Sequence, residues 1–259
     1  MKRKIRFLSI AAFGTLIMLS PDLFSQDEKA MQYFRDYGKT GINVFEAPAV
    51  DDTPFNGLHV QVGGGLAVQY QAMWHSNEIA VGDTAGNPNI LIPVRNGFNL
   101  PTANLNLDAQ LADGIRMNLI TYLSARHHNE AWVKGGYIQI DKLAMLNNDF
   151  VDKVMENVTV KVGQMEINYG DAHFRRTDNG NAMYNPFIGN NIIDAFTTEV
   201  AGEIYWRKNG IIVMGAISEG LIHPDVGSAQ DQHDPSFYGK LGYDNEAEER
   251  LRWRLTLST

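Results

Sequence analysis

The sequence predicts an all-β protein, an antiparallel transmembrane β-barrel, and three observations support this fold class. The chain begins with a basic and then apolar segment that is typical of export signals. No later segment is apolar over the roughly 20 residues that a membrane-spanning helix needs. Residues 57–259 instead alternate repeatedly between apolar and polar side chains, which places lipid-facing and lumen-facing residues on opposite faces of a strand.

Residues 1–25 are expected to be a cleavable signal peptide. Four basic residues lie among the first six, and an apolar run follows over residues 7–19. This run is shorter than a spanning helix requires, and the expected cleavage site follows Ser25. The alternative is that the segment remains as an N-terminal membrane anchor.

Residues 26–56 are expected to form a periplasmic lead-in before the barrel domain, 57–259. They lack strand-like alternation and end in a link that contains Pro48 and Pro54. Asp27–Tyr37 is compatible with one short helix.

The clearest strand pattern begins near Val60. Apolar side chains occupy alternate positions over about 16 residues, whereas a strand of a globular protein has about 5–6. The face expected to meet lipid holds Val62, Leu66, Val68 and Trp74. The face expected to line a lumen holds Gln61, Gln69 and Gln71.

Eight further segments are expected to be strands, most of them with the same alternation, which gives about nine strands. They are expected near residues 104–111, 115–119, 132–141, 158–163, 198–207, 211–218, 237–243 and 250–258. Asp113-Gly114 and Asn209-Gly210 predict short hairpin turns. Long polar links separate other strands, as in outer-membrane barrels. A soluble β-sandwich is the alternative, although its strands would be shorter.

The strand count also bears on completeness. Strands in lipid must close into a barrel, and bacterial single-chain barrels have even strand numbers. About nine strands, the last of which ends without an aromatic residue, predict the N-terminal part of a longer barrel that is open in this chain.

Composition restricts the chemistry. The chain has no cysteine, so disulfides and thiol sites are excluded, and its net charge of −8 argues against binding of nucleic acid. No metal site is expected, because the adjacent His127 and His128 face opposite ways on an extended chain. No catalytic residue or cofactor is assigned. A membrane-embedded hydrolase remains an alternative, although no Gly-x-Ser-x-Gly element is present.

Basic residues on polar strand faces are the candidate functional residues. Arg250, Arg252 and Arg254 recur at every second position and therefore share one face, over about 13 Å. Because their neighbours are apolar, they are expected to line the lumen, where unpaired arginines favour anions. The alternative is that they pair with acids such as Glu199 and Glu203.

Two further pairs of basic residues are also candidate functional residues. Arg116 and Lys161 also occupy polar faces and are expected to line the pore. Arg175 and Arg176 lie in the polar stretch 173–191, a candidate pore constriction, with a solvated surface loop as the alternative.

Several segments resemble a known family. They are Gly41–Glu46, Pro54–Gly57, His75–Asn77 and, most specifically, Val162–Gly180. They are similar to Bacteroidetes-type outer-membrane porins, which are related to the phosphate-selective porin O/P family, and the similarity covers most of residues 38–259.

The resemblance implies a 16-stranded barrel in the outer membrane. It also implies a water-filled diffusion channel for small hydrophilic solutes, with lipid and small or anionic solutes as partners and a homotrimer as the candidate assembly. The family's pore-lining residues do not align one by one with this chain, so an anion or phosphate preference rests on the arginines alone. A structural or adhesion barrel with a blocked lumen is another alternative.

Overall fold

The computed structural model describes residues 30–35, 44–68, 70–77, 91, 93–98, 102–124, 130–171, 198–220, 234–246 and 252–259. The chain divides into two compact units, Met1–Ala30 and Met31–Thr259. The expected signal peptide, residues 1–25, lies outside the described residues. All of the strands described below belong to the second unit.

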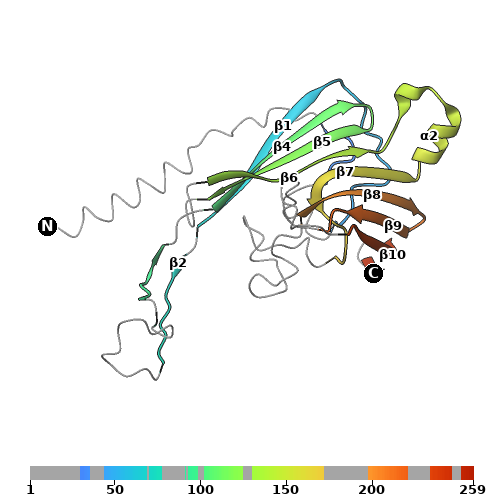
Figure 1. The fold of residues 1–259 in the computed structure, drawn as a ribbon. Coiled ribbons are helices and arrows are strands. Elements are labelled where there is room, and N and C mark those ends of the chain that lie inside the picture. The colour runs from blue at the N-terminus through green and yellow to red at the C-terminus, as the bar shows by residue number, and fades with distance from the viewer. Residues whose placement is uncertain are drawn as a thin grey trace. The chain divides into compact units, whose positions relative to one another are not determined.

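Nine strands form one antiparallel sheet in the order β1-β4-β5-β6-β7-β8-β9-β10-β11 (Figure 1). They are β1 His59–Ala67, β4 Thr102–Ala112, β5 Ile115–Ser124, β6 Glu130–Ile140, β7 Val158–Glu166, β8 Thr198–Lys208, β9 Ile211–Ser218, β10 Ser236–Glu246 and β11 Arg252–Ser258. The short strands β2 (Tyr70–Gln71) and β3 (Gly97–Phe98) pair separately. The prediction of about nine antiparallel strands is therefore confirmed.

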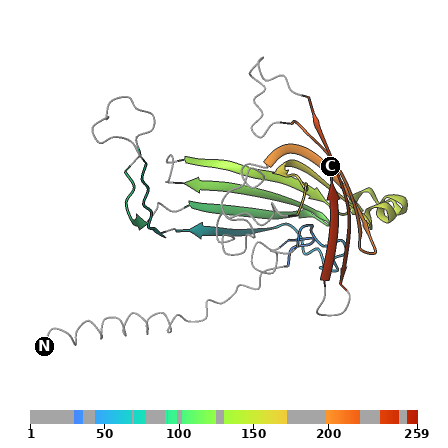
Figure 2. The same cartoon turned by 90° about the horizontal axis from the view of Figure 1, so that it is seen from below.

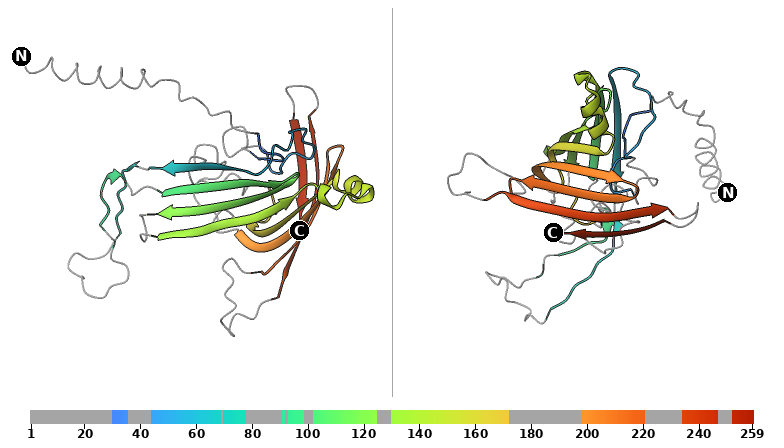
Figure 3. Two further views of the ribbon diagram at one scale, coloured as in Figure 1. Left: turned by 90° about the horizontal axis from the view of Figure 1, so that it is seen from above. Right: turned by 90° about the vertical axis from the view of Figure 1, so that its right-hand side faces the viewer.

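Most of these strands are long. β4, β6, β8 and β10 have 11 residues each, and β5 has 10. A strand needs about 9–11 residues to cross a bilayer at a tilt. The sheet twists strongly, and the strand direction turns steadily from β1 to β11 (Figures 2 and 3). The sheet is open: β1 and β11 form its two edges.

The first strand is shorter than its sequence pattern predicts. β1 ends at Ala67, which pairs with Thr102, the first residue of β4. Val68 and Trp74 are exposed as expected but lie outside the strands, and Gln69 lies outside the described residues. The alternation of apolar and polar residues alone did not reveal that β1 ends at Ala67.

Both predicted hairpin turns are present. β4 and β5 are joined through Asp113 and Gly114, which has φ +70°. Asn209 and Gly210, between β8 and β9, both have positive φ, as a type I′ turn requires. A Cβ on Gly210 would lie 2.6 Å from the carbonyl oxygen of Asp244, so this turn is also closely packed.

The link between β6 and β7 holds helices that the sequence analysis did not predict. A short 3-10 helix, Ala144–Leu146, precedes α2, Asp149–Met155. The side chain of Asn148 caps α2 by accepting hydrogen bonds from the backbone N–H groups of Phe150 and Val151. Among the described residues, no helix is long and apolar enough to cross a membrane.

The helix that is compatible with Asp27–Tyr37 does not form over Met31–Arg35. These residues form a turn, and Tyr33 has φ +52°. The backbone N–H groups of Gln32 and Tyr33 donate to side chains of Gln110 and Asp51 rather than to helical carbonyls. Tertiary contacts thus override the local helical pattern.

The two faces of the nine-stranded sheet are inverted relative to a soluble protein. One face is exposed and apolar; it includes Val60, Val62, Leu66, Val162, Ile204, Ile217, Leu241, Leu255 and Leu257. The other face is buried and largely polar; it includes Asn106, Asp108, Gln110, Arg116, Asn118, Gln139, Glu203 and Lys240. Leu255 is 72% exposed, whereas Lys240 on the neighbouring strand is 1% exposed. A soluble sandwich buries its aliphatic face, whereas the described residues of this sheet leave theirs exposed.

Candidate functional site: a charged cluster on the buried face

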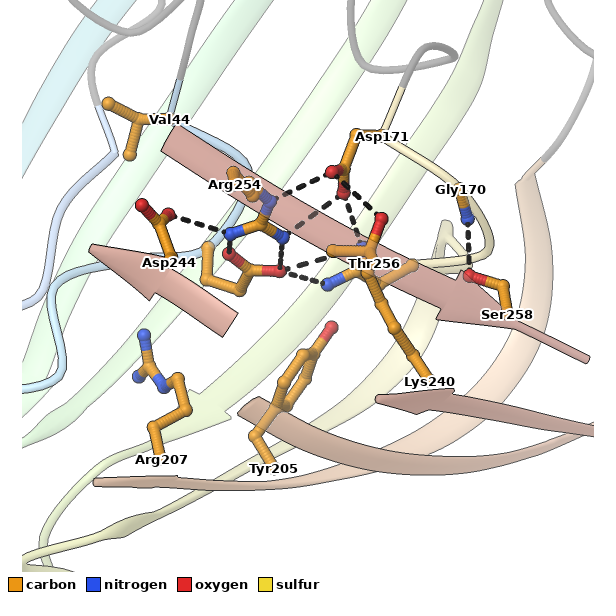
Figure 4. Close-up of polar contacts among 12 residues, drawn as sticks. Val44, Gly170, Asp171, Tyr205, Arg207, Lys240, Asp244, Arg254, Thr256 and Ser258 are labelled. Carbon is orange, nitrogen blue, oxygen red and sulfur yellow. Dashed lines mark hydrogen bonds and ion pairs between the residues drawn. The ribbon is translucent and has the colours of Figure 1, made fainter. Parts of the chain in front are cut away.

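A network of charged side chains occupies the buried face around Arg254 (Figure 4). Its acidic members come from the lead-in, from the segment after β7 and from β10, and its basic members come from β10 and β11. They are Glu46, Asp171, Asp244, Lys240, Arg252 and Arg254.

The pleat of β11 directs the arginines to this face. Trp253 and Leu255 are exposed, so the alternate residues Arg252 and Arg254 point to the opposite side. Asp244 of β10 lies directly opposite Arg254 in the register. Local alternation and strand pairing together therefore place Arg254 beside its first acidic partner.

Arg254 is the centre of the cluster. Its Nε and Nη2 atoms donate to the carboxylate of Asp171 at 2.8 and 3.1 Å. Its Nη1 and Nη2 atoms donate to Glu46 at 2.9 and 2.7 Å, and Nη1 also donates to Asp244 at 2.9 Å. These contacts match the five N–H donors of a guanidinium group. Its side chain is only 10% exposed, so the three carboxylates, not bulk water, satisfy it.

Lys240 joins the same carboxylates. Its Nζ atom lies 2.6 Å from Asp171, 2.6 Å from the side-chain oxygen of Asn168 and 3.6 Å from Glu46. Arg252 forms a bidentate pair with Asp244. Three cations therefore face three carboxylates, and the cluster has no net charge.

The cations control the ionisation of the two carboxylates outside the strands. Burial alone would raise the pKa of Glu46, but hydrogen bonds and positive charge from Arg254, with help from Asn168 and Lys240, lower it below its usual value. For Asp171 burial is likewise outweighed by Arg254 and Lys240, and the pKa is lowered. Both groups are therefore charged at neutral pH.

Glu46 connects the lead-in, of which the structure describes residues 30–35 and 44–56, to the buried face. The Asn168 amide donates to Glu46 at 2.9 Å, and the guanidinium of Arg254 lies 4.9 Å from the centre of the Phe45 ring. Arg207 of β8 donates to the backbone carbonyls of Ala47 and Pro48.

Burial and the charges of acids around the tyrosine, mainly Asp141, Asp51 and Asp113, raise the pKa of Tyr33 in this lead-in to about 12.

A second group of contacts fixes the lead-in near the β4–β5 turn. The backbone N–H of Gln32 donates to Gln110 at 3.0 Å, and the Gln32 side chain bonds to Asp113 and to the N–H of Gly114, both at 2.9 Å. The lead-in thus contacts β4, β8 and β11, which are widely separated in the sheet order. Its described residues 32 and 46–48 therefore lie at separate places on the buried face.

The segment that follows β7 also turns onto this face. Asn168 is buried, and its backbone N–H donates to Glu203 at 2.7 Å. The N–H of Gly170 donates to the hydroxyl of Ser258 at 3.2 Å. Thr256 donates to Asp171 at 3.2 Å. This segment forms the first part of the long link in which a constriction was expected.

The other predicted pore-lining cations are also on the buried face and also paired. Lys161 lies 3.4 Å from Glu203, which accepts a 2.6 Å hydrogen bond from the hydroxyl of Tyr205. Arg116 lies 3.4 Å from Asp108 and donates to Gln139 at 2.8 Å.

A preference for anions was expected only if the arginines of this strand face were unpaired. Arg252 and Arg254 are both paired with carboxylates, so they do not meet this condition. Their partners differ from the acids named in the sequence analysis. Glu199 instead accepts from Ser218 and Tyr238. Arg175, Arg176 and Arg250 lie outside the described residues.

Sequence reasoning missed Glu46, Asn168 and Asp171. Glu46 and Arg254 are 208 residues apart, and no local pattern connects them. Asp244 had a usable signal, because it directly follows the predicted strand 237–243, and that strand precedes the strand of the arginines, with which it pairs.

Among the residues that the structure describes, no group of three or more His, Cys, Asp or Glu side chains is arranged to hold a metal ion. The hydroxyl of Ser218 bonds to Glu199 and to the N–H of Gly220, and that of Ser258 accepts from Gly170. These serine contacts involve carboxylate and backbone groups rather than a histidine base.

Comparison with known proteins gave no match. No family model, no curated protein and no solved structure matches the chain.

Proposed function

We propose that this chain forms part of the wall of an outer-membrane porin, a water-filled β-barrel through which small hydrophilic solutes diffuse. The observation that carries the proposal is the inversion of the sheet: aliphatic side chains cover its exposed face and polar side chains its buried face. Such a large apolar surface is unfavourable in water and favourable in lipid. A lumen, in contrast, is suited to amides, carboxylates and cations.

Aromatic residues on the exposed face support this location. Trp206, Tyr243 and Trp253 are all exposed and all lie near the end of the sheet that carries the β4–β5 and β8–β9 turns. The rings of Tyr243 and Trp253 are 5.1 Å apart. Aromatic residues gather at membrane–water interfaces, and the shorter connections of a bacterial barrel lie on the periplasmic side.

The two open edges of the sheet concern how the proposed barrel closes. β1 and β11 each have a strand partner on one side only among the described residues. In lipid, each unpaired backbone group costs roughly several kcal/mol. In a membrane barrel, further strands must therefore pair with both edges of this sheet. We propose that such strands complete a barrel of about 16 strands, as the family resemblance implies, after export by the signal in residues 1–25.

The balanced charge of the cluster determines the solute class that we propose. Since Arg252 and Arg254 are paired with carboxylates, they do not supply a free positive field. The proposed solutes are therefore small hydrophilic molecules without a strong requirement for negative charge.

A structural barrel with a blocked lumen is the second candidate. The lead-in favours it, because Glu46, Ala47 and Pro48 are all held on the buried face by arginines of β8 and β11. A segment fixed there reduces the space through which solute can pass.

Planar-bilayer recording of the complete barrel, with the further strands that we propose, and of its Glu46→Ala variant tests both candidates. A porin gives stepwise currents before any substitution. A blocked barrel gives currents only after Glu46→Ala releases the lead-in. The matched control is Glu156→Ala, in the β6–β7 link, which should leave the currents unchanged. Absence of current from both proteins, while they remain inserted in the bilayer, would contradict the channel.

A further inference from the structure

The β6–β7 link carries an apolar surface that the channel does not explain. Figure 1 shows α2 beyond the ends of β6 and β7. Four large apolar side chains there are exposed; they are Met145, Leu146, Phe150 and Val154. Phe150 is 75% exposed. In water, so many exposed apolar side chains within ten residues would be unfavourable.

The sequence of α2 is amphipathic. Phe150, Val151, Val154 and Met155 fall on one side of the helix at 100° per residue. Asp149, Asp152, Lys153 and Glu156 fall on the opposite side. Met155 is buried, whereas Phe150 and Val154 are exposed. Only one edge of the apolar side is therefore covered by the protein.

The link lies at the level of the aromatic residues. Met155, the last residue of α2, comes three positions before Val158, which pairs with Trp206 across the sheet. The backbone N–H of Arg207 also donates to the carbonyl of Asn157 at 2.8 Å. The helix is thus attached where the exposed apolar face of the sheet ends.

We infer that α2 and the preceding 3-10 helix form a membrane-surface anchor, with Phe150 and Val154 inserted among phospholipid head groups and acyl chains. The inference rests on the proposed location of the sheet in a membrane. Amphipathic helices bind at this depth through their apolar side. The polar side holds three acids and one lysine, so apolar insertion rather than attraction to anionic lipid provides the binding.

Site-directed spin labelling tests the anchor directly, because the chain has no cysteine of its own. Nitroxides are attached to the single variants Phe150→Cys, Val154→Cys and Lys153→Cys in the full chain, reconstituted in phosphatidylcholine vesicles. Ile204→Cys, on the exposed face of β8, serves as the lipid-facing reference. Accessibility to oxygen reports lipid, and accessibility to a water-soluble nickel complex reports solvent.

The inference predicts that oxygen accessibility exceeds nickel accessibility at positions 150 and 154 and that the order reverses at 153. If positions 150 and 154 respond like 153 while 204 faces lipid, the anchor is disproved and the membrane location of the sheet stands. If both reagents are excluded from 150 and 154, a protein partner covers the helix and the anchor is again disproved. If position 204 faces water, the proposed function itself fails.

Discussion

The exposed and buried faces of the sheet belong to the same strands but are held in different ways. On the exposed face, side chains such as Ile204 and Leu255 need only an apolar surrounding. On the buried face, Arg254 needs three specific carboxylates, and two of them come from outside the strands. The exposed face therefore depends on the medium around it. The buried face depends on contacts with residues that are distant in the sequence.

This difference predicts unequal sensitivity to substitution. In the membrane location that we propose, a change on the exposed face should matter according to its depth in lipid. A change on the buried face should matter according to how many buried ionic contacts it removes.

The largest effect is expected for Arg254→Met on the buried face. The substitution keeps an extended side chain but removes the buried cation that Glu46, Asp171 and Asp244 share, and it leaves these three carboxylates with Lys240 and Arg252 alone. Breaking a buried ion pair costs about 3–5 kcal/mol, and we expect the free energy of unfolding to fall by that order. Urea unfolding in phospholipid vesicles measures it.

Arg254→Lys is the control that separates the effect of the positive charge from the effect of the bidentate geometry. A lysine keeps the positive charge but cannot bind two carboxylates in a bidentate manner, so an intermediate loss is expected. Equal stability of Arg254→Met and the unaltered protein would show that the cluster does not hold the buried face together.

Ile204→Arg tests the exposed face. Ile204 lies in the middle of β8, so in a membrane the substitution should lower the free energy of unfolding by about 2–4 kcal/mol. The same change at Ile211, close to the aromatic residues, should cost only about 0–1 kcal/mol. Small and equal effects at both positions would place this face in water, where surface substitutions change stability by about 0.5 kcal/mol or less.

The exposed face was largely predictable from the sequence for a physical reason. Side chains of a strand alternate between faces, so the exposure of Val62 and Leu66, like the burial of Asp108, follows from local order alone. The hairpin turns were predictable too, because Asn209 and Gly210 tolerate positive φ.

The buried face was predictable only in part. Alternation gave the orientation of Arg252 and Arg254 but not their partners, because Glu46 and Asp171 reach them through tertiary folding. α2 was missed because seven residues are too few for a periodic signal. The cap at Asn148 was its one local sign.

Acid should weaken the attachment of the lead-in to the buried face. The pKa values of Glu46 and Asp171 are lower in the folded protein than their ordinary values of 4.5 and 3.8. Their contribution to stability is therefore fully present above those ordinary values and is lost as the pH falls through the lowered folded values. Protease accessibility of residues 44–56 should increase below about pH 4.

Glu46→Gln separates this effect from general acid unfolding. It removes the charge but keeps hydrogen-bonding atoms, and a hydrogen bond to a charged group contributes about 1.5–3 kcal/mol. The variant should show increased lead-in accessibility at pH 7 and a smaller further increase in acid. An acid response identical to that of the unaltered protein would mean that Glu46 is not the group whose protonation releases the lead-in.

Arg252→Ala should have the smallest effect, although Arg252 lies only two residues from Arg254 on the same strand face. Its side chain is 42% exposed, and its ion pair with Asp244 has access to solvent. Exposed ion pairs contribute about 0–1 kcal/mol, so the urea midpoint should hardly move. Asp244 also keeps its bond to Arg254 at 2.9 Å, so the substitution leaves no carboxylate without a cation. A loss as large as that of Arg254→Met would show that position on the buried face, rather than the number and burial of the ionic contacts removed, determines the cost.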